Sequence, residues 1–456
     1  MVKLRSVAPV MGVRFSLIAQ TMEFSRWKNF FVAMIMLETL VAGFSFILNQ
    51  AGNIDIGLAT TSNDLQKNTS ANIEENQTVL PDIENTASVE ILPEKLSNPP
   101  KIIKAVYVTG WSAGSKSYLN YLTYLFKTTE INGVVIDIKD YSGLMPYVPN
   151  TEQVKKYELY NNAIPDINVL VRFFHNQNIY VIGRIAVFED PAFSKARPDL
   201  AVFDKTKSSP ASPPVLWYDN HKLSWLDPAS KEVWDYNISI AKDVLLHGFD
   251  EINFDYIRFP SDGKTQNMGF PYWDEKTPMR AVLKNFYKYL RQELPDVKLS
   301  ADLFGQTTVN SDDLGIGQII EDSLEYFDFV CPMVYPSHYA ENFMGFQNPA
   351  DFPYEVVNYS MSTALKKETA YKNLKIAEIT PPTADTQTMP EIKPEVKMAK
   401  FRPWLQDFNI GAIYTAEMVK QEIKATQDSL GDNYFGFMLW NPSNIYNQDA
   451  IKKAID

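Results

Sequence analysis

Hydrophobic and polar residues alternate with a period of two along Gly248–Pro260 (GFDEINFDYIRFP), and this stretch predicts a buried strand. One face carries Ile252, Phe254 and the ring of Tyr256, and the other carries Asn253 and Asp255. The strand is expected to end at Pro260, because proline has no N–H to donate to a sheet. Burying an unpaired charge is unfavourable, so we expect Asp255 to face water, a ligand or a partner such as Arg258.

Strand-like apolar runs alternate with helical patterns from Lys101 onwards. The predicted strands are Ala105–Trp111, Gly133–Asp140, Tyr180–Phe188, Gly248–Pro260, Val297–Gly305, Phe327–Tyr335, Lys400–Phe408 and Tyr434–Trp440. Helices are predicted at residues 117–128, 164–176, 230–247 and 278–294. Leu374–Ile379 is an alternative seventh strand, and Pro381–Pro394 is expected to be an inserted loop. This alternation predicts an α/β fold, one (β/α)8 TIM barrel with enlarged loops over residues 101–456.

The N-terminal 100 residues follow a different pattern. Residues 1–29 are basic, with five Lys or Arg against one acid, and residues 30–48 form an apolar run of nineteen residues. A basic flank before such a run predicts a transmembrane signal anchor with its N-terminus in the cytoplasm, a cleaved signal peptide being the alternative. Residues 49–100 contain no aromatic residue and predict a disordered polar linker. We therefore expect a single-pass protein of the cell membrane, with its barrel on the extracytoplasmic side.

Composition narrows the chemistry. The formal charge of −12 argues against a nucleic-acid partner, and the single cysteine excludes an internal disulfide. The four histidines lack the spacing of a zinc hydrolase, and no glycine-rich nucleotide loop precedes a helix, so no cofactor is expected. Long acidic loops leave calcium binding open, although none has EF-hand spacing. Aromatic residues make up 13% of the chain, which suits stacking on sugar rings as well as packing a large core.

Polar residues recur near the C-terminal ends of the predicted strands, where a barrel places its active site. The candidate substrate-binding residues are Trp111, Asp137, Lys139, Arg184, Tyr256, Arg258, Tyr335, His338, Arg402, Trp404, Gln406, Trp440 and Asn441, with Trp217 as a further stacking candidate. Asp255 and Asp302 lie on consecutive strands and form the candidate catalytic pair. Two carboxyl groups, one ionised and one protonated, are what glycoside hydrolysis requires. The alternative for Asp302 is an ion pair with Arg184 or Lys139.

Seven motifs in order carry a resemblance to a known family: YVTGWSAGS, NGVVIDIKD, GFDEINFDYIRFPSDG, SADLFG, CPMVYPSHY, RPWLQDF and LWNPSN. They resemble a bacterial family of unknown function described as a "putative glycosyl hydrolase domain", within the TIM-barrel glycosidases distantly similar to α-amylases. The resemblance covers about Lys101 to Tyr446 and implies a barrel that hydrolyses glycosidic bonds.

Similarity to α-amylase-like barrels implies that Asp255 is the nucleophile and Asp302 the general acid/base. Amylases have Glu at the second position and a third acid on strand 7. Here Asp407 has the parity of helix-facing residues, which leaves Gln406 for a substrate-binding role. Glu189, Asp190 and Asp328 are the alternative acids.

Three functions fit these observations. The first is a membrane-tethered glycoside hydrolase acting on an envelope or extracellular polysaccharide. The second is a polysaccharide-binding barrel without catalysis, since a fold alone does not decide between the two. The third is a metal-dependent deacetylase or phosphodiesterase with Asp137, Asp255 and Asp302 as ligands, which the absence of clustered histidines disfavours.

Overall fold

The computed structural model describes residues 92–209, 212–379 and 396–453. The predicted signal anchor at 30–48 and the loop at Pro381–Pro394 lie outside these ranges. Within them, no helix is both long and apolar enough to cross a membrane.

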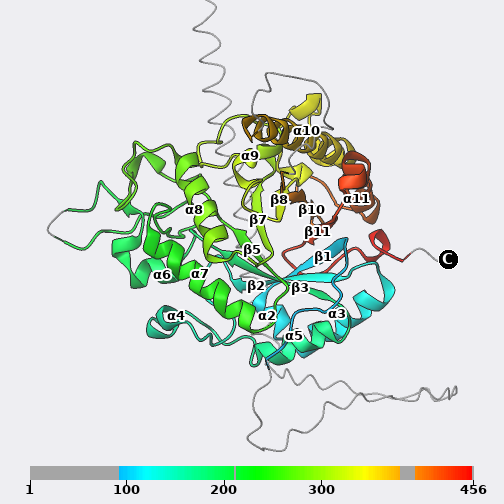
Figure 1. Cartoon of the computed structure of the whole chain (residues 1–456), viewed down its shortest axis with the longest axis horizontal. Helices are drawn as coiled ribbons and strands as arrows, with labels where there is room; N and C mark the ends of the chain where they lie inside the picture. Colours follow the sequence, from blue (N-terminus) through cyan, green and yellow to red (C-terminus); the bar gives the residue numbers. More distant parts are fainter. Residues whose placement is uncertain (1–91, 210–211, 380–395, 454–456) are drawn as a thin grey trace, which may run out of the picture.

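The strands form a closed parallel barrel, as predicted (Figure 1). In chain order they are β1 (Ile103–Val108), β2 (Gly133–Lys139), β3 (Tyr180–Ala186), β5 (Glu251–Asp255), β7 (Leu299–Phe304), β8 (Phe329–Met333), β9 (Lys400–Phe401), β10 (Trp404–Gln406) and β11 (Gly436–Trp440). Each strand pairs with the next around the ring, and β11 returns to β1. β9 and β10 share the seventh position, so the (β/α)8 prediction is confirmed.

Helices surround this ring, and the longer ones are α3 (Lys116–Thr128), α5 (Ile167–His175), α7 (Lys231–Leu246), α8 (Met279–Glu293), α10 (Pro353–Ile379) and α11 (Ala416–Leu430). Shorter helices are α2 (Gly110–Ala113), α4 (Glu152–Lys156), α6 (Pro191–Ala196) and α9 (Ile320–Ser323). A small antiparallel pair, β4 (Phe203–Asp204) with β6 (Met268–Gly269), lies in the long loops after β3 and β5. Leu374–Ile379 is the last part of α10, so the alternative seventh strand is excluded.

The side chains divide into two apolar layers. One buried cluster fills the barrel interior and includes Ala105, Val135, Ile182, Cys331 and Met438, while a larger cluster lies between strands and helices. Alternation along each strand separates the two layers, because successive side chains point to opposite faces. The same parity places Asn253 and Asp255 inside the barrel, as their spacing predicted.

Two strands depart from the prediction for local reasons. β5 ends at Asp255 rather than Pro260, because Tyr256 has a φ of 52° in the left-handed region and turns the chain out of the sheet. The seventh strand divides at Arg402 and Pro403 into β9, which pairs with β8, and β10, which pairs with β11. Proline has no N–H for the ladder, so an interruption there is expected.

Residues 92–100 have no regular secondary structure but contact the barrel. The backbone N–H of Leu96 donates to Asp250 Oδ1 at 2.7 Å, and the carbonyl of Pro93 lies so close to Gly248 that a side chain there would clash. Both contacts lie where β5 begins. Ordered contacts therefore start before Lys101, at the N-terminal end of the barrel.

Candidate active site

A cavity opens at the C-terminal ends of the strands, where a TIM barrel is expected to carry its site. Its lining includes Arg184 from β3, Asp255 from β5, Asp302 from β7, Trp404 from β10 and Trp440 from β11. These residues come from strands far apart in the sequence, and the closure of the barrel brings them together. These five predicted residues therefore line one cavity.

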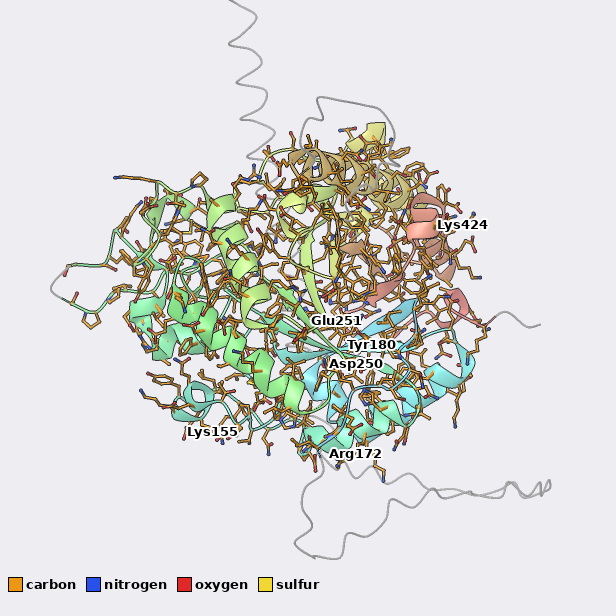
Figure 2. All side chains as sticks on the ribbon, viewed as in Figure 1. Lys155, Arg172, Tyr180, Asp250, Glu251 and Lys424 are labelled. Atoms are coloured by element: carbon orange, nitrogen blue, oxygen red, sulfur yellow. The ribbon has the colours of Figure 1, made fainter. Side chains whose placement is uncertain are left out.

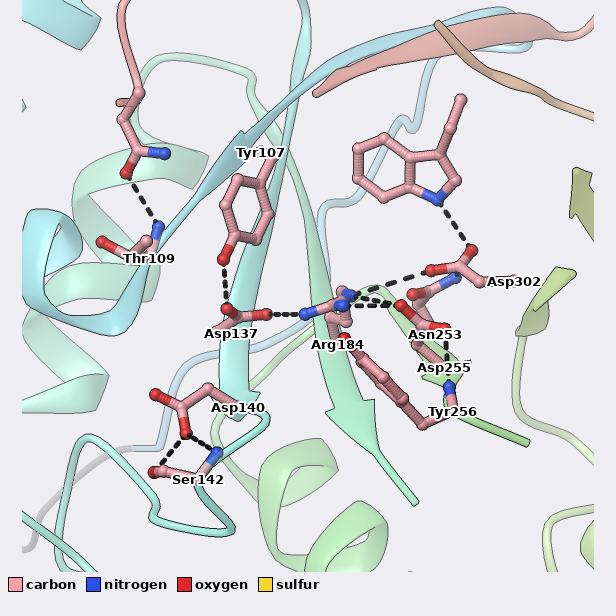
Figure 3. A network of polar contacts seen from close by, with 12 residues as sticks. Tyr107, Thr109, Asp137, Asp140, Ser142, Arg184, Asn253, Asp255, Tyr256 and Asp302 are labelled. Carbon is pink, nitrogen blue, oxygen red and sulfur yellow. Dashed lines mark hydrogen bonds and ion pairs between the residues drawn. The ribbon is translucent and has the colours of Figure 1, made fainter. Parts of the chain in front are cut away.

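The guanidinium of Arg184 lies between three carboxyl groups (Figure 3). Its Nη1 donates to Asp137 Oδ1 at 2.5 Å, and its Nη2 and Nε donate to Asp255 Oδ2 at 2.5 and 3.2 Å. Its Nε also lies 3.7 Å from Asp302 Oδ2. Burial opposes the charge of Arg184, yet Asp137 and Asp255 hold its pKa well above the usual range. The Arg184 side chain is therefore charged and held in one position.

Both carboxyl oxygens of Asp255 accept hydrogen bonds from donors that the fold holds in place. Arg184 contacts its Oδ2, and the backbone N–H of Tyr256 donates to its Oδ1 at 2.5 Å. The left-handed conformation of Tyr256 is uncommon for a bulky residue, and such strain is often stored at functional sites. The two donors fix the orientation of the Asp255 carboxyl group.

Asp302 has the opposite environment. Its Oδ1 accepts hydrogen bonds from Asn253 Nδ2 and Trp404 Nε1, both at 2.8 Å. Its Oδ2 is buried and accepts no hydrogen bond from the described residues. Burial, together with the Asp255 charge, raises the pKa of Asp302 well above its usual range. The carboxyl group is thus oriented through Oδ1, and its raised pKa favours the protonated form.

Asp137 lies behind Arg184, one step from the cavity. Tyr107 donates its hydroxyl proton to Asp137 Oδ2 at 2.5 Å. Burial raises the pKa of Asp137, and the Arg184 charge opposes that rise. Burial and the Asp137 charge also raise the pKa of Tyr107, which therefore keeps its proton as a donor. The Tyr107–Asp137–Arg184 chain holds the guanidinium in place.

The two candidate catalytic groups are close. Because Asp255 Oδ2 and Asp302 Oδ2 lie 3.2 and 3.7 Å from the same nitrogen, they are less than about 7 Å apart. This bound accommodates the spacing of retaining glycosidases, about 5 Å, and the shorter part of the inverting range. One ionised and one protonated carboxyl group at this separation can perform acid-assisted glycosidic cleavage.

The same cluster bears on metal binding. Asp137, Asp255 and Asp302, the ligands of the metal-dependent alternative, all face the Arg184 guanidinium, whose charge takes the position a cation would need. Across the described ranges, no group of three or more His, Cys, Asp or Glu side chains is placed to hold a metal ion.

Aromatic rings form one wall of the cavity. Tyr335 stacks on Trp440 with ring centroids 5.7 Å apart and an interplanar angle of 28°. Trp404 approaches Tyr107 edge to face at 6.4 Å. His338 lies beside Tyr335, and burial lowers its pKa to about 3, so its ring is neutral. Such a wall offers apolar faces for a sugar ring.

The structure places the predicted substrate-binding residues in two groups. The cavity lining contains Arg184, Tyr256, Arg258, Tyr335, His338, Trp404 and Trp440. The lining does not contain Trp111, Asp137, Lys139, Arg402, Gln406 or Asn441. Trp111 is 52% exposed on α2, and Asp137 contacts the cavity only through Arg184.

Lys139 departs from the predicted interior parity. The pairing of β2 with β3 shifts register between Asp137 and Lys139, and this irregularity turns Lys139 out of the barrel. Its ammonium donates to Asp190 Oδ2 at 2.7 Å and lies over the Tyr236 ring on α7. Both charged groups of this pair are fully buried, so it belongs to the packing between barrel and helices.

Other predicted residues hold loops or the base of the barrel. Arg402 pairs with Glu251 at the N-terminal end, and Gln406 Oε1 accepts from the Ser337 hydroxyl at 2.9 Å. Asn441 donates to the carbonyls of Asp407 and Ile445. Trp217 is buried away from the cavity and donates to the Lys264 carbonyl at 3.0 Å.

The alternative acids, and Asp407 of the seventh strand, also lie elsewhere. Asp190 caps α6 and binds Lys139, and Asp328 binds Arg291 and Lys397 beside the N-terminal end of β8. Asp407 accepts from the Asn447 backbone at 2.8 Å, and burial raises its pKa to about 7. None of these three lines the cavity, nor does Glu189.

Several lining residues had not been selected from the sequence, namely Tyr107, Thr109, Tyr141, Phe304, Gly305, Gln306, Met333 and Pro442. Tyr107, Phe304 and Met333 have the interior parity of their strands, so extending the alternation to every strand finds them. Tyr141, Gln306 and Pro442 lie in loops, which carry no such period.

Comparison with solved structures finds several similar chains. A hypothetical protein from Ruminiclostridium thermocellum ATCC 27405 is 38% identical, with 46% of this chain and 98% of that chain covered and a TM-score of 0.39. The glycoside hydrolase domain of PgaB (BpsB) from Bordetella bronchiseptica is 14% identical, with 78% and 100% covered and a TM-score of 0.50. That of PelA from Pseudomonas aeruginosa is 11% identical, with 76% and 97% covered and a TM-score of 0.37.

Curated proteins of known function give no match. A family model does match, over residues 105–446, which span the barrel from β1 to the loop after β11. The chain therefore belongs to the family described as "Putative glycosyl hydrolase domain".

Proposed function

We propose that this protein is a glycoside hydrolase that cleaves a polysaccharide with Asp255 and Asp302. Asp255 is the ionised group that attacks or stabilises the anomeric carbon, and Asp302 is the acid that protonates the departing oxygen. The observation that carries this assignment is the asymmetry of the pair. Asp255 accepts from a cation and a backbone N–H, whereas Asp302 has a buried Oδ2 without a donor among the described residues.

The proposed reaction uses the proton that the raised pKa of Asp302 retains. Protonation of the glycosidic oxygen by Asp302 allows the bond to the anomeric carbon to break, and Asp255 stabilises the positive charge that develops there. Water then adds to the anomeric carbon and its proton returns to Asp302, which completes the hydrolysis. Arg184 fixes the position of Asp255. The aromatic wall of Tyr335 and Trp440 supports the sugar ring.

Hydrolysis is tested by reducing-end release from a panel of bacterial and plant polysaccharides. The full chain, kept in detergent, is compared with its Asp302→Asn variant, and Asp449→Asn on the exposed surface is the matched control. We expect turnover by the parent and the control and at least a hundredfold loss in Asp302→Asn. Equal turnover in Asp302→Asn contradicts the assignment.

Binding of a polysaccharide without any release of reducing ends supports the polysaccharide-binding barrel instead. Loss of turnover with a chelator supports the metal-dependent alternative.

We further propose that residues 30–48 tether the barrel to the outer face of the cell membrane. There it would act on an envelope or extracellular polysaccharide. The support is the basic flank and apolar run of the sequence. Removal of residues 1–48 is expected to move the protein from the membrane fraction to the soluble fraction, measured by carbonate extraction and immunoblotting. A mature N-terminus beyond residue 48, found by mass spectrometry, indicates cleavage instead.

A further inference from the structure

Arg258 is a second arginine of the cavity and has a different environment from Arg184. It follows β5 in the segment that leaves the barrel, is only 3% exposed, and lines the cavity. Its guanidinium lies over the rings of Trp225, Phe304 and Tyr256, at 4.6, 4.9 and 5.4 Å from their centroids. Aromatic faces hold the side chain in one orientation.

The hydrogen bonds of Arg258 use one side of the guanidinium. Nη1 donates to the Phe259 carbonyl at 3.3 Å and to the Ser261 hydroxyl at 3.1 Å. Among the residues that the structure describes, none accepts a hydrogen bond from Nε or Nη2. The Nε–Nη2 edge therefore has no acceptor among the described residues, and Arg258 lines the cavity.

No carboxylate of the described residues compensates this cation directly. Arg184 has Asp137 and Asp255 at 2.5 Å, and Arg402 has Glu251, whereas no described Asp or Glu oxygen lies within 4.0 Å of Arg258. Asp262 is close enough for the Arg258 charge to oppose the effect of burial on its pKa, but the two form no ion pair. A buried charge without a partner is costly, and aromatic faces offset only part of that cost.

We propose that the Nε–Nη2 edge of Arg258 binds the carboxylate of a uronic acid unit, so that the substrate is an acidic polysaccharide. This edge presents two parallel N–H donors, the geometry that matches the two oxygens of a carboxylate. Asp255 and Asp302 line the same cavity, so the acidic sugar lies at or beside the scissile bond. The inference rests on the proposed hydrolase function and specifies its substrate class.

The net negative charge of the protein excludes a general electrostatic attraction as the cause of binding to an acidic polymer. At −12 the chain repels a polyanion overall, so general electrostatic attraction does not account for tight binding of an acidic polymer. A preference for acidic sugars must come from a local cation, and the charge of Arg184 is already balanced by its carboxylates.

The test compares matched polymers that differ only in charge. Oligosaccharides of polygalacturonate, alginate and glucuronoxylan are prepared as such and after reduction of each carboxylate to a primary alcohol. Binding to the full-length Asp302→Asn protein, which retains Arg258 and lacks the proposed acid, is measured by calorimetry at physiological salt. We expect at least one acidic oligosaccharide to bind tenfold or more tightly than its reduced form.

Variants connect this preference to Arg258. Arg258→Gln is expected to abolish the difference between acidic and reduced forms, and Arg258→Lys to retain part of it, because Lys keeps the charge without the paired donors. Arg280→Gln is the matched control, since Arg280 is half exposed on α8 and pairs with Asp322. Circular dichroism verifies that each variant is folded. The comparison of acidic with reduced oligosaccharides is made on the Asp302→Asn protein, so it still tests the inference if the Arg258 variants do not fold.

Each outcome decides one of the two proposals. Equal or tighter binding of the reduced forms, or no binding of any acidic oligosaccharide, overturns the acidic-substrate inference. A phosphate-bearing polymer that alone shows Arg258-dependent binding overturns the assignment to a uronate. If the protein hydrolyses neutral polymers and no acidic ones, the acidic-substrate inference is wrong and the hydrolase proposal stands. If it binds acidic polymers through Arg258 without hydrolysing any polymer, the hydrolase proposal is wrong and the acidic-ligand inference stands.

Discussion

The two ends of the barrel interior both contain buried charges but use them differently; Figure 2 labels Glu251 and Tyr180, which belong to the N-terminal end. At the N-terminal end, Glu251 pairs with Arg402 and also accepts from the Tyr180 hydroxyl at 3.2 Å, and both charged side chains are fully buried. At the C-terminal end, Arg184 faces Asp137, Asp255 and Asp302 beside a cavity. The first end matches one anion to one cation, and the second has a surplus of carboxyl groups.

This difference distinguishes buried ion pairs that stabilise the fold from carboxyl groups that can take part in catalysis. A matched, enclosed pair has no proton to exchange and no access to a substrate, so its residues serve the fold. Burial, together with the Asp255 charge, raises the pKa of Asp302, and this carboxyl group lines the cavity. Excess carboxylate and access together mark the catalytic end.

The strongest test of this contrast is Asp255→Asn. Loss of the ionised carboxylate is expected to reduce kcat by about a thousandfold or more, because the group acts on the reacting carbon itself. Turnover on the best polysaccharide of the panel is the measurement. Asp449→Asn, an exposed carboxylate, should match the parent; a kcat for Asp255→Asn within tenfold of the parent contradicts the proposed role.

The opposite end is tested with Glu251→Gln. This variant leaves Arg402 as a buried charge without its anion, and we expect the free energy of unfolding to fall by about 3 kcal/mol. Urea denaturation followed by tryptophan fluorescence measures the change. The kcat of the folded protein should stay within twofold of the parent, and a large selective loss of kcat would place Glu251 in the chemistry.

Tyr107→Phe examines the support behind the site. Removing the hydroxyl leaves Asp137 without one of its donors and loosens the position of Arg184. We expect about a tenfold fall in kcat with a small change in KM. Tyr124→Phe, at an exposed tyrosine on α3, is the control. If both variants behave alike, the Tyr107 hydroxyl does not support catalysis.

The smallest expected effect is a change in thermal stability. Glu251→Gln at the N-terminal end is expected to destabilise the protein, whereas Asp302→Asn at the C-terminal end is expected to stabilise it. Because the folded state raises the pKa of Asp302, the unfolded chain releases this proton first as pH rises, and stability falls above the ordinary pKa of an aspartate. Asp302→Asn has no proton to release, so its Tm should exceed that of the parent by about 1–3 °C at pH 7. The two proteins should converge near pH 4 in a calorimetric series. A lower Tm for Asp302→Asn at pH 7 contradicts the raised pKa.

Much of the site follows from alternation along the strands. Parity alone places Asn253, Asp255 and Asp302 inside one barrel, and the barrel itself follows from repeated strand and helix patterns. Parity assumes a regular strand, however, and fails at Lys139, where β2 shifts register against β3. It also misses the left-handed turn at Tyr256, because a tyrosine carries no local signal for that conformation.

Loop residues form the other limit of prediction. Tyr141, Gln306 and Pro442 line the cavity through the paths of loops after different strands, and these paths depend on tertiary contacts. The pairing of Arg402 with Glu251 is likewise a contact between residues distant in sequence. Sequence patterns identify which residues face inward but not which end of the barrel each one serves.

The anchoring of Leu96 and Pro93 beneath β5 has a practical consequence for handling the protein. The chain enters the barrel at the end opposite the cavity. A bead, chip or carrier attached next to residue 92 would hold the barrel by its N-terminal end and leave the cavity end toward solution. Immobilisation by this terminus should therefore preserve access for long polymers, whereas attachment through lysines at random would obstruct a share of the molecules.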